Sequence, residues 1–266
     1  MAKTILITGA TDGIGLETAK VLAAEGHILL IHGRNQAKLG KVETELKAIR
    51  SVSTVEAYVA DLSSLPDVKA LARAILTKHS HVDVLLNNAG VFRLSDASTK
   101  SGIDARFVVN TIAPYLLTKL LLHAMDENSR VVNLSSAAQA PVNLNALEGK
   151  VQFDDDFSAY AQSKLAITMW TRVMAEKLGE SGPAFIAVNP GSMLASKMVQ
   201  EGFGVSGNDL SIGVDILVRA GLSDEFAYAS GKYWDNDSKM FSPPHPDGLD
   251  DEKAQAIVDA IERIIA

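Results

Sequence analysis

Short apolar segments alternate with longer segments of helical periodicity along the whole chain. The apolar segments predict β-strands, because buried strands read as short continuous hydrophobic runs. They are Thr4–Thr8, Ile28–His32, Val55–Ala60, Val84–Asn87, Arg130–Leu134, Phe185–Val188 and Gly231–Trp234. Strands that alternate with helices are joined by right-handed crossovers. The pattern therefore predicts an α/β fold, a doubly wound parallel sheet of about seven strands with helices on both faces.

No internal repeat, low-complexity tract or linker interrupts this alternation, so we expect residues 1–266 to form a single domain. The one proline-dense stretch, residues 242–246, precedes a final helix that we expect over Asp250–Ile265. Acidic residues at its start suit the positive end of a helix dipole. With 47% hydrophobic residues, a chain of 266 residues can bury one large core.

Composition and charge argue against several kinds of ligand and location. The net charge is -7 and the isoelectric point is about 5.4, so no basic field attracts nucleic acid. The chain has no cysteine, which excludes disulfides, thiol nucleophiles and cysteine-ligated metals and fits a reducing, cytoplasmic location. Its six histidines show no metal-ligand spacing. The first predicted strand starts at once, without a signal peptide, and we read no apolar run near the ~18 residues that span a membrane.

A glycine-rich loop joins the first predicted strand to a helix. Its spacing is G-x-x-x-G-x-G, and its members Gly9, Thr11, Asp12, Gly13, Ile14 and Gly15 are candidate cofactor-binding residues. Glycines let the backbone turn tightly and approach a pyrophosphate, while the free N–H groups of the first helical turn face the anion. The alternative is a plain glycine turn, but the strand–loop–helix context favours a dinucleotide site.

Two asparagines and a glycine follow the fourth predicted strand, in the string Asn87-Asn88-Ala89-Gly90. Such a string also forms ordinary turns. In an open α/β sheet, however, ligands bind at the carboxyl ends of the strands. We therefore expect the asparagine side chains to hold strand ends together, and Asn88, Ala89 and Gly90 to form a wall beside the cofactor.

Tyr160 and Lys164 are four residues apart in a helical segment, so their side chains share one face. A free tyrosine ionises near pH ~10 and is a poor acid or base at neutrality. A cation at about 4 Å would favour the phenolate by ~4 kcal/mol at an effective dielectric of about 20. The pair thus predicts a tyrosine prepared for proton transfer, although an isolated Y-x-x-x-K also occurs on ordinary helix surfaces.

These motifs, in this order, resemble those of the short-chain dehydrogenase/reductase family, in its single-domain branch and most closely its retinol-dehydrogenase-like bacterial members. The matching strings are Thr8 to Gly15, Asn87 to Gly90, Asn110, Asn133-Leu134-Ser135-Ser136, Tyr160 to Lys164 and Asn189-Pro190-Gly191. The resemblance covers about the first three quarters of the chain and implies a Rossmann-like fold. It also implies a nicotinamide cofactor, a small-molecule carbonyl or alcohol substrate, and pairing into a homodimer or homotetramer through the helices that carry Asn110 and Tyr160.

The residues after the second predicted strand bear on the choice of cofactor. Enzymes that prefer NAD usually place an acidic residue there, but this chain has Gly33 followed by Arg34 and Asn35. An arginine can clamp a 2′-phosphate with two charge-assisted hydrogen bonds, so we prefer NADP(H), with NAD(H) as the alternative. Arg34 can also be read as a solvated residue that opens the next helix. By resemblance, Asp61 and Leu62 contact the adenine, although Asp61 also suits a turn or helix cap.

The resemblance assigns a catalytic role to four residues. Tyr160 exchanges a proton with the substrate oxygen, and Ser136, rather than Ser135, hydrogen-bonds the same oxygen. Lys164 lowers the pKa of Tyr160 and grips the nicotinamide ribose. Asn110 holds a water that links Lys164 to solvent, although a polar residue inside a helix also serves to bond backbone. Pro190 and Gly191 complete the list of cofactor-binding residues.

Two segments are candidate sources of substrate specificity. Residues 137–159 form an extension that we expect to make a hairpin or flap, and its triplet Asp154-Asp155-Asp156 reads as a solvated loop rather than a metal site. Residues 192–210 supply apolar side chains and glycines that suit an adaptable, mobile pocket or lid, with a helix packed on the core as the alternative. The apolar side chains are Met193, Leu194, Met198, Val199, Phe203 and Val205.

The sequence therefore predicts an NADP(H)-dependent oxidoreductase acting on a small or medium apolar carbonyl or alcohol. The alternative is an NADPH-binding sensor or scaffold on the same fold, because a fold does not fix a function. Such proteins usually lack the tyrosine or the lysine, and this chain has both.

Overall fold

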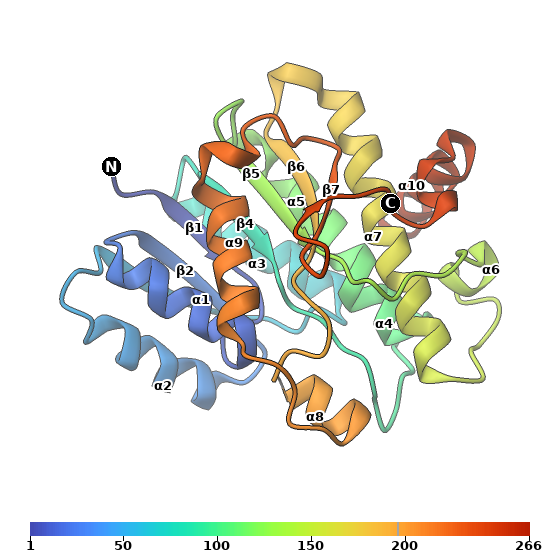
Figure 1. Ribbon diagram of the computed structural model, residues 1–266, viewed down its shortest axis with the longest axis horizontal. Coiled ribbons are helices and arrows are strands. Elements are labelled where there is room, and N and C mark those ends of the chain that lie inside the picture. The colour runs from blue at the N-terminus through green and yellow to red at the C-terminus, as the bar shows by residue number, and fades with distance from the viewer. Residues whose placement is uncertain (196) are drawn as a thin grey trace.

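The computed structural model describes residues 1–195 and 197–266, without the side chains of Lys197, Glu201 and Phe203. Its centre is a sheet of eight strands in the order β3-β2-β1-β4-β5-β6-β7-β8, counted over the described residues (Figure 1). The strands are β1 (Thr4–Ile7), β2 (Ile28–Gly33), β3 (Thr54–Val59), β4 (Val84–Asn87), β5 (Arg130–Leu134), β6 (Ala184–Asn189), β7 (Tyr233–Asp235) and β8 (Met240–Phe241). Strands β1 to β7 pair in parallel, and β8 pairs antiparallel to β7. The predicted doubly wound α/β sheet is confirmed, and two-residue β8 adds a strand too short to leave a sequence pattern.

Helices cover both faces of the sheet. They are α1 (Gly13–Ala24), α2 (Gln36–Lys47), α3 (Leu65–Lys78), α4 (Ala105–Phe107), α5 (Ala113–Leu121), α6 (Leu144–Leu147), α7 (Asp156–Leu178), α8 (Lys197–Phe203), α9 (Ser211–Leu222) and α10 (Asp251–Ile265). A π-helical segment, η1 (Val108–Ile112), joins α4 to α5, and short 3-10 turns occupy η2 (Leu122–Ala124), η3 (Gly179–Ser181), η4 (Asp224–Phe226) and η5 (Pro246–Leu249).

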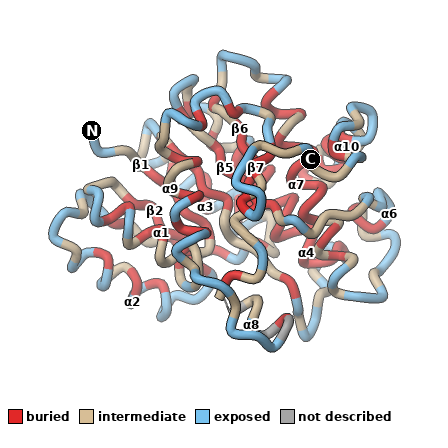
Figure 2. The backbone as a smooth tube through the Cα atoms, viewed as in Figure 1, coloured by how far each residue is buried: buried red, intermediate tan, exposed pale blue. Residues whose placement is uncertain are grey.

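Alternation along the strands divides the core in two. Ile5 and Ile7 of β1 face α1, α2 and α9, whereas Leu6 between them faces the layer of α3, α5 and α7. Successive side chains of a strand point to opposite faces, so a strand buried on both sides must be apolar throughout. Figure 2 shows the buried backbone running through the strands and the inner sides of the helices. This arrangement leaves the carboxyl ends of the strands as the place for a site.

The expectation that no apolar run is long enough to span a membrane is wrong for residues 105–124. This segment is 20 residues long with a mean hydropathy of 1.3, so by length and composition it is able to cross a membrane. In the fold, 78% of its most apolar window is buried, because α4, η1 and α5 form the layer against the sheet. A helix in the core of a protein can be as long and as apolar as one that crosses a membrane, so length and composition do not distinguish the two.

The C-terminal helix begins where the sequence indicates. Asp250 is its N-cap, and the carboxylate accepts a hydrogen bond from the Lys253 N–H at 3.0 Å. Helix α10 packs along α7, and the hydroxyl of Tyr115 in α5 donates to Glu262 of α10 at 2.7 Å. Part of the face that the resemblance assigns to subunit pairing is therefore covered by the chain itself. Pairing into a homodimer or homotetramer stays a prediction.

Candidate active site

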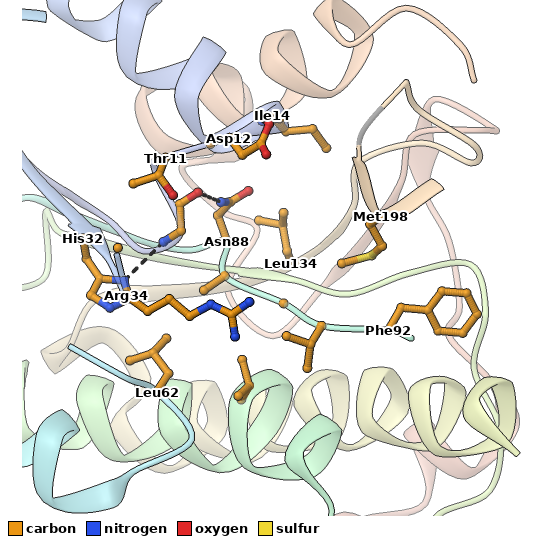
Figure 3. A pocket seen from close by; sticks show the side chains of 18 of the residues that line it. Thr11, Asp12, Ile14, His32, Arg34, Leu62, Asn88, Phe92, Leu134 and Met198 are labelled. Carbon is orange, nitrogen blue, oxygen red and sulfur yellow. Dashed lines mark hydrogen bonds between the residues drawn. The ribbon is translucent and has the colours of Figure 1, made fainter. Parts of the chain in front are cut away.

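A cleft of about 500 Å³ opens at the carboxyl ends of β1, β2, β4 and β5 (Figure 3). It runs from the end of β2, past the glycine loop, to the N-terminal half of α7. Among the residues predicted from the sequence, the following line it: Gly9, Thr11, Asp12, Gly13, Ile14, Gly15, Arg34, Asn35, Asp61, Leu62, Asn88, Ala89, Gly90, Tyr160, Lys164 and Pro190. The structure thus gathers into one cleft residues that are spread over most of the chain.

The glycine loop has the conformation that close approach of a ligand requires. Gly9 and Gly13 have positive φ angles of 67° and 53°, which favour glycine. A Cβ on Gly15 would lie 2.4 Å from the carbonyl oxygen of Gly9 and 2.4 Å from the amide nitrogen of Asn88. Asp12 caps α1 by accepting the N–H of Gly13 at 2.8 Å. The loop therefore presents backbone, not side chains, to the floor of the cleft.

Hydrogen bonds tie this loop to the end of β4, as the sequence predicts. The Asn88 side-chain amide donates to the carbonyls of Thr8 and Gly9 at 2.8 and 3.1 Å. In return, the Thr8 hydroxyl accepts from the backbone N–H groups of Asn88 and Ala89, both at 3.0 Å. Asn87 donates to Asn133 at 2.8 Å and thus joins β4 to β5. The asparagines hold the strand ends together beside the cleft.

His32 is a member of the site that the sequence reading missed. It is buried at the end of β2, and its Nδ1 accepts the N–H of Gly9 at 3.3 Å (Figure 3). Nε2 therefore carries the proton and donates to the carbonyl of Ala60 at 3.0 Å. Burial lowers the pKa of His32, which keeps the ring neutral. One imidazole thus connects the glycine loop with β2 and the end of β3, a contact that no local pattern reveals.

The end of the cleft beside β2 is basic. A Cβ on Gly33 would lie 2.5 Å from Cγ2 of Thr11, so an acidic side chain there would displace Thr11. Arg34 is exposed at the rim, and Lys38, which the sequence reading did not select, lies beside it in the cleft lining. Asn35 also serves as the N-cap of α2, accepting the N–H of Lys38 at 2.9 Å.

Asp61 and Leu62 line the same end of the cleft after β3. Asp61 accepts hydrogen bonds from the backbone N–H and the hydroxyl of Ser63 at 2.9 and 2.8 Å. It is thus a turn residue, one of the two roles that the sequence left open, and it also faces the cleft. Leu62 is buried and supplies an apolar surface there.

Tyr160 and Lys164 lie side by side on α7 at the other end of the cleft. The Lys164 ammonium is 5.5 Å from the centroid of the Tyr160 ring, and it donates to the carbonyl of Leu134 at 2.7 Å. Lys164 is only 4% exposed, so α7 holds a charged amine against the end of β5. Burial without a carboxylate partner lowers the pKa of Lys164 to about 8.

The expected effect of Lys164 on Tyr160 is wrong for this structure. Burial raises the pKa of Tyr160 above its ordinary value, and only a hydrogen bond with Ser136 lowers it. The ammonium faces the aromatic ring and is directed to the Leu134 carbonyl, so its charge acts less on the phenol oxygen than the helical spacing suggested. The four-residue spacing correctly predicts that Lys164 lies beside Tyr160. It does not predict the burial of the phenol, which raises the pKa of Tyr160.

The adjacent serines make different contacts, and their division into a catalytic and a structural serine stays a prediction. The Ser136 hydroxyl acts to lower the pKa of Tyr160, and its oxygen accepts the N–H of Ala138 at 3.1 Å. Ser135 is buried; its hydroxyl lies 2.6 Å from that of Thr168 and 3.2 Å from the carbonyl of Lys164. Ser135 therefore fastens β5 to α7.

Asn110 lies in the π-helical segment η1, with both halves of its amide bonded to protein. Its oxygen accepts the N–H of Val91 at 2.8 Å, and its nitrogen donates to the Val91 carbonyl at 2.9 Å. The nitrogen also donates to Ser163 at 3.0 Å, and Ser163 donates to the carbonyl of Tyr160 at 2.7 Å. π-Segments often mark functional sites, and this one clamps the loop after β4 to α7. The water that Asn110 is expected to hold stays a prediction.

The segment after β6 closes the cleft near Tyr160. Pro190 lines it, and Gly191 turns away with a φ of 122°, donating its N–H to Asn189 at 3.3 Å. Residues beyond form a loop whose base is tied by backbone bonds from Ala195 to Asn208 at 2.7 Å and from Asn208 to Met193 at 2.6 Å. Helix α8 is its outer part, and Met198 reaches the cleft, whereas the Phe203 side chain lies outside the described residues.

Of the hairpin or flap expected for residues 137–159, the structure shows no hairpin, because no strand forms there, and the flap stays a prediction. The segment contains the short helix α6, and Phe153 packs on Phe107 with ring centroids 5.6 Å apart. Its acidic triplet is not a purely solvated loop. Asp155 caps α7 through the N–H of Ser158 at 2.7 Å, and Asp156 pairs with the buried Arg106. Among the described residues, no group of three or more candidate ligands is placed to hold a metal.

We expect the buried charge of Lys164 to reduce stability in a pH-dependent way. Below pH 8, folded and unfolded states both keep the proton, and the cost of burying the charge is complete. Between pH 8 and 10.5 the folded state loses its proton first, so stability rises through this window. Lys164→Met removes the cost of burying the charge but leaves the Leu134 carbonyl without its hydrogen bond. The net effect should be an increase in the unfolding free energy of about 1 to 2 kcal/mol at neutral pH.

Urea denaturation at about pH 7 and pH 9.5 measures the unfolding free energies of Lys164→Met and of the unmodified protein, both without cofactor. The advantage of Lys164→Met should shrink at the higher pH. A variant that is less stable than the unmodified protein by the same amount at both pH values would contradict the burial of a charged amine.

Comparison with known proteins agrees with this geometry. Residues 3–203 match the family model described as short chain dehydrogenase. Human retinol dehydrogenase 13 is 31% identical over 96% of this chain and 82% of its own length. Retinol dehydrogenase 12 of Bos taurus is 36% identical over 76% of this chain and 64% of its own.

Two solved structures have the same fold. A metagenomic short-chain oxidoreductase in complex with NADP superposes with a TM-score of 0.62 at 27% identity, over 82% of this chain and 90% of that one. An NADPH-bound carbonyl reductase from chicken fatty liver superposes with a TM-score of 0.70 at 22% identity, over 91% of this chain and 99% of that one. With its glycine loop, its Asn-Asn-Ala-Gly turn and its Tyr160–Lys164 pair in one cleft, the chain belongs to the short-chain dehydrogenase family, whose members are NAD(P)-dependent oxidoreductases.

Proposed function

We propose that this protein is an NADP(H)-dependent oxidoreductase that interconverts a carbonyl and an alcohol, with Tyr160 as the general acid and base. The observation that carries the proposal is the meeting of three groups at the end of a dinucleotide cleft. The Ser136 hydroxyl acts on the Tyr160 phenol and lowers its pKa, and the Lys164 ammonium lies 5.5 Å from the centroid of the Tyr160 ring. A proton donor, a hydroxyl that orients the same oxygen and a nearby cation are what carbonyl reduction needs.

The residues of the cleft fit a dinucleotide. Gly9 and Gly15 pack so closely on the turn after β4 that a Cβ on either would clash with Ala89 or Asn88. The loop therefore brings bare backbone to the start of α1, where free N–H groups suit a phosphate. Thr11, Asp12 and Ile14 would hold the pyrophosphate region, Asp61 and Leu62 the adenine, and Asn88 to Gly90 the adjoining ribose. When bound, the nicotinamide supplies a hydride to the carbonyl carbon in the reductive direction.

The protein supplies the proton in that direction. Burial raises the pKa of Tyr160, so the phenol is protonated at neutral pH and is able to donate to the substrate oxygen. Ser136 hydrogen-bonds the phenolate that forms. The amine of Lys164, with a pKa near 8, is able to return a proton toward Tyr160 from solvent. Hydride on carbon and proton on oxygen complete the alcohol, and the same residues reverse these steps in oxidation.

The preference for NADP(H) rests on the basic rim beside β2. Arg34 and Lys38 lie where a phosphate on the adenosine ribose would sit, and Gly33 leaves no room for a competing carboxylate. NADP or NADPH in the two related solved structures supports the same preference.

The substrate end of the cleft is largely apolar, with one cation beside it. Its lining includes Phe92, which packs on Tyr160, together with Leu94 and Met198, and the Arg93 guanidinium lies 5.9 Å from the centroid of the Phe92 ring. Relatives at about a third identity are retinol dehydrogenases and a human polyprenol dehydrogenase, whose names specify long apolar alcohols. We infer that the carbonyl or alcohol handled here carries an apolar substituent.

Replacement of the acid tests the function. Tyr160→Phe should reduce NADPH-dependent turnover of aldehydes by at least about 10²-fold, because the proton donor is lost, while NADPH still binds. Ser136→Ala should lower kcat strongly, whereas Ser135→Ala should mainly lower stability. Absorbance of the reduced nicotinamide follows turnover, and fluorescence titration follows binding. If the protein binds NADPH but shows no turnover that depends on Tyr160, the result would instead favour an NADPH-binding sensor or scaffold.

Removal of the basic rim tests the cofactor. Arg34→Ala and Lys38→Ala should each raise the KM for NADPH by roughly 10-fold or more, as expected for a lost charged hydrogen bond, and leave the KM for NADH nearly unchanged. Lys41→Ala, on the same helix but outside the cleft lining, is the matched control. A strong preference of the unmodified enzyme for NADH would refute the role of Arg34.

A further inference from the structure

Phe92 stands directly in front of the proposed proton donor. Its ring centroid is 5.0 Å from that of Tyr160, with the two planes inclined at 56°. The side chain lines the cleft, yet the residue is only 5% exposed, so neighbours surround most of it. In Figure 3 it lies at the end of the cleft beside Met198. No motif selected from the sequence includes Phe92.

The backbone that carries Phe92 is fixed. The preceding residue, Val91, has its N–H and its carbonyl bonded to the same Asn110 amide at 2.8 and 2.9 Å. Asn110 in turn is buried in the π-helical segment and bonded to Ser163 of α7. With the backbone clamped on both sides of Val91, the position of the Phe92 ring is set mainly by what the ring contacts.

Gly202 of α8 packs against one edge of the Phe92 ring. A Cβ on Gly202 would lie 2.8 Å from Cε1 and 2.9 Å from Cδ1 of Phe92, closer than carbon atoms approach without displacement. The base of the loop that carries α8 resists movement. Backbone bonds join Asn208 to Met193 and Ala195, and Gly207 packs so closely that its Cβ would lie 2.7 Å from Cα of Ala195. The ring thus contacts Tyr160 and the backbone of α8, and the Arg93 guanidinium lies 5.9 Å from its centroid.

We propose that Phe92, positioned by Gly202, sets the largest substituent that a carbonyl substrate can carry at Tyr160. The inference rests on the proposed function, because a substrate oxygen bonded to Tyr160 and Ser136 must place its substituents beside the Tyr160 ring. On that side the wall is the Phe92 ring. Size selection in an apolar pocket follows from steric exclusion and lost contact area, each worth about tenfold per small group.

Two substitutions should change selectivity in opposite directions. Phe92→Ala removes the wall, and Gly202→Ala pushes the ring away from α8 and so changes the space beside Tyr160. The readout is kcat/KM with NADPH for propanal, benzaldehyde and naphthaldehyde. We expect Phe92→Ala to raise the ratio of naphthaldehyde to propanal by about tenfold or more, and Gly202→Ala to lower it by a similar factor.

The double variant decides whether the two residues act through one contact. Once the ring is gone, Gly202→Ala has nothing to displace, so Phe92→Ala/Gly202→Ala should keep the selectivity of Phe92→Ala within about twofold. Independent, multiplicative effects of the two changes on the ratio would overturn the proposed contact.

Phe157→Ala is the matched control. Phe157 contacts the Phe92 ring at a centroid distance of 6.5 Å but is 52% exposed and lies on the outer side of the aromatic group. Its removal should leave the selectivity ratio within about twofold, and the Kd for NADPH of all the variants should stay close to that of the unmodified enzyme. Phe92→Ala empties a buried position and should lower the Tm, so the kinetics are measured at a temperature at which every variant is folded. If Phe157→Ala shifts the ratio as much as Phe92→Ala does, general loosening explains the effect and the proposal fails.

Failure of this inference is distinguishable from failure of the proposed function. An unmodified enzyme that reduces the aldehydes in a Tyr160-dependent manner, but whose ratio is insensitive to Phe92→Ala, overturns the role of Phe92 alone. An unmodified enzyme that binds NADPH and reduces none of the three aldehydes overturns both.

Discussion

The hydrogen bond from the buried Lys164 amine to the Leu134 carbonyl is the interaction on which the site depends. It spans 2.7 Å between α7 and the end of β5, the two elements that bring Tyr160 and Ser136 together. Carrying a charge in this place is unfavourable, as the lowered pKa of Lys164 shows. Functional sites often keep such unfavourable groups because the chemistry requires them, and the surrounding core provides the stability.

A second set of contacts makes the cleft rigid. Asn110 in η1 joins the loop after β4 to α7, His32 joins the glycine loop to β2 and β3, and Asn88 joins that loop to β4. Each of these side chains bonds backbone groups that lie far away in the chain. The cofactor floor and the proton donor therefore lie on one connected framework, which is what orientation of two reacting partners requires.

Features encoded by local pattern could be predicted from the sequence. The alternation of strands and helices, the glycine loop and the Tyr160–Lys164 pair all depend on periodicity or on fixed spacing. His32 and Phe92 were missed because their roles come from contacts between distant segments, which no spacing encodes. Lys38 lies one helical turn after Arg34, so the spacing could have indicated it. The sign of the pKa shift of Tyr160 was wrong for a related reason, since burial depends on the whole fold. Of the hairpin or flap expected in residues 137–159, the hairpin is absent because that segment packs as coil and the short helix α6 on the core.

The central claim is that the chain moves a hydride to a carbonyl with Tyr160 as the proton source. The most direct measurement uses NADPH that carries deuterium at the transferable position of the nicotinamide, with benzaldehyde as acceptor and mass spectrometry of the alcohol. The account predicts one deuterium on the carbinol carbon with the unmodified protein and almost none with Tyr160→Phe. Alcohol formed without deuterium, or labelled equally well by Tyr160→Phe, would contradict it.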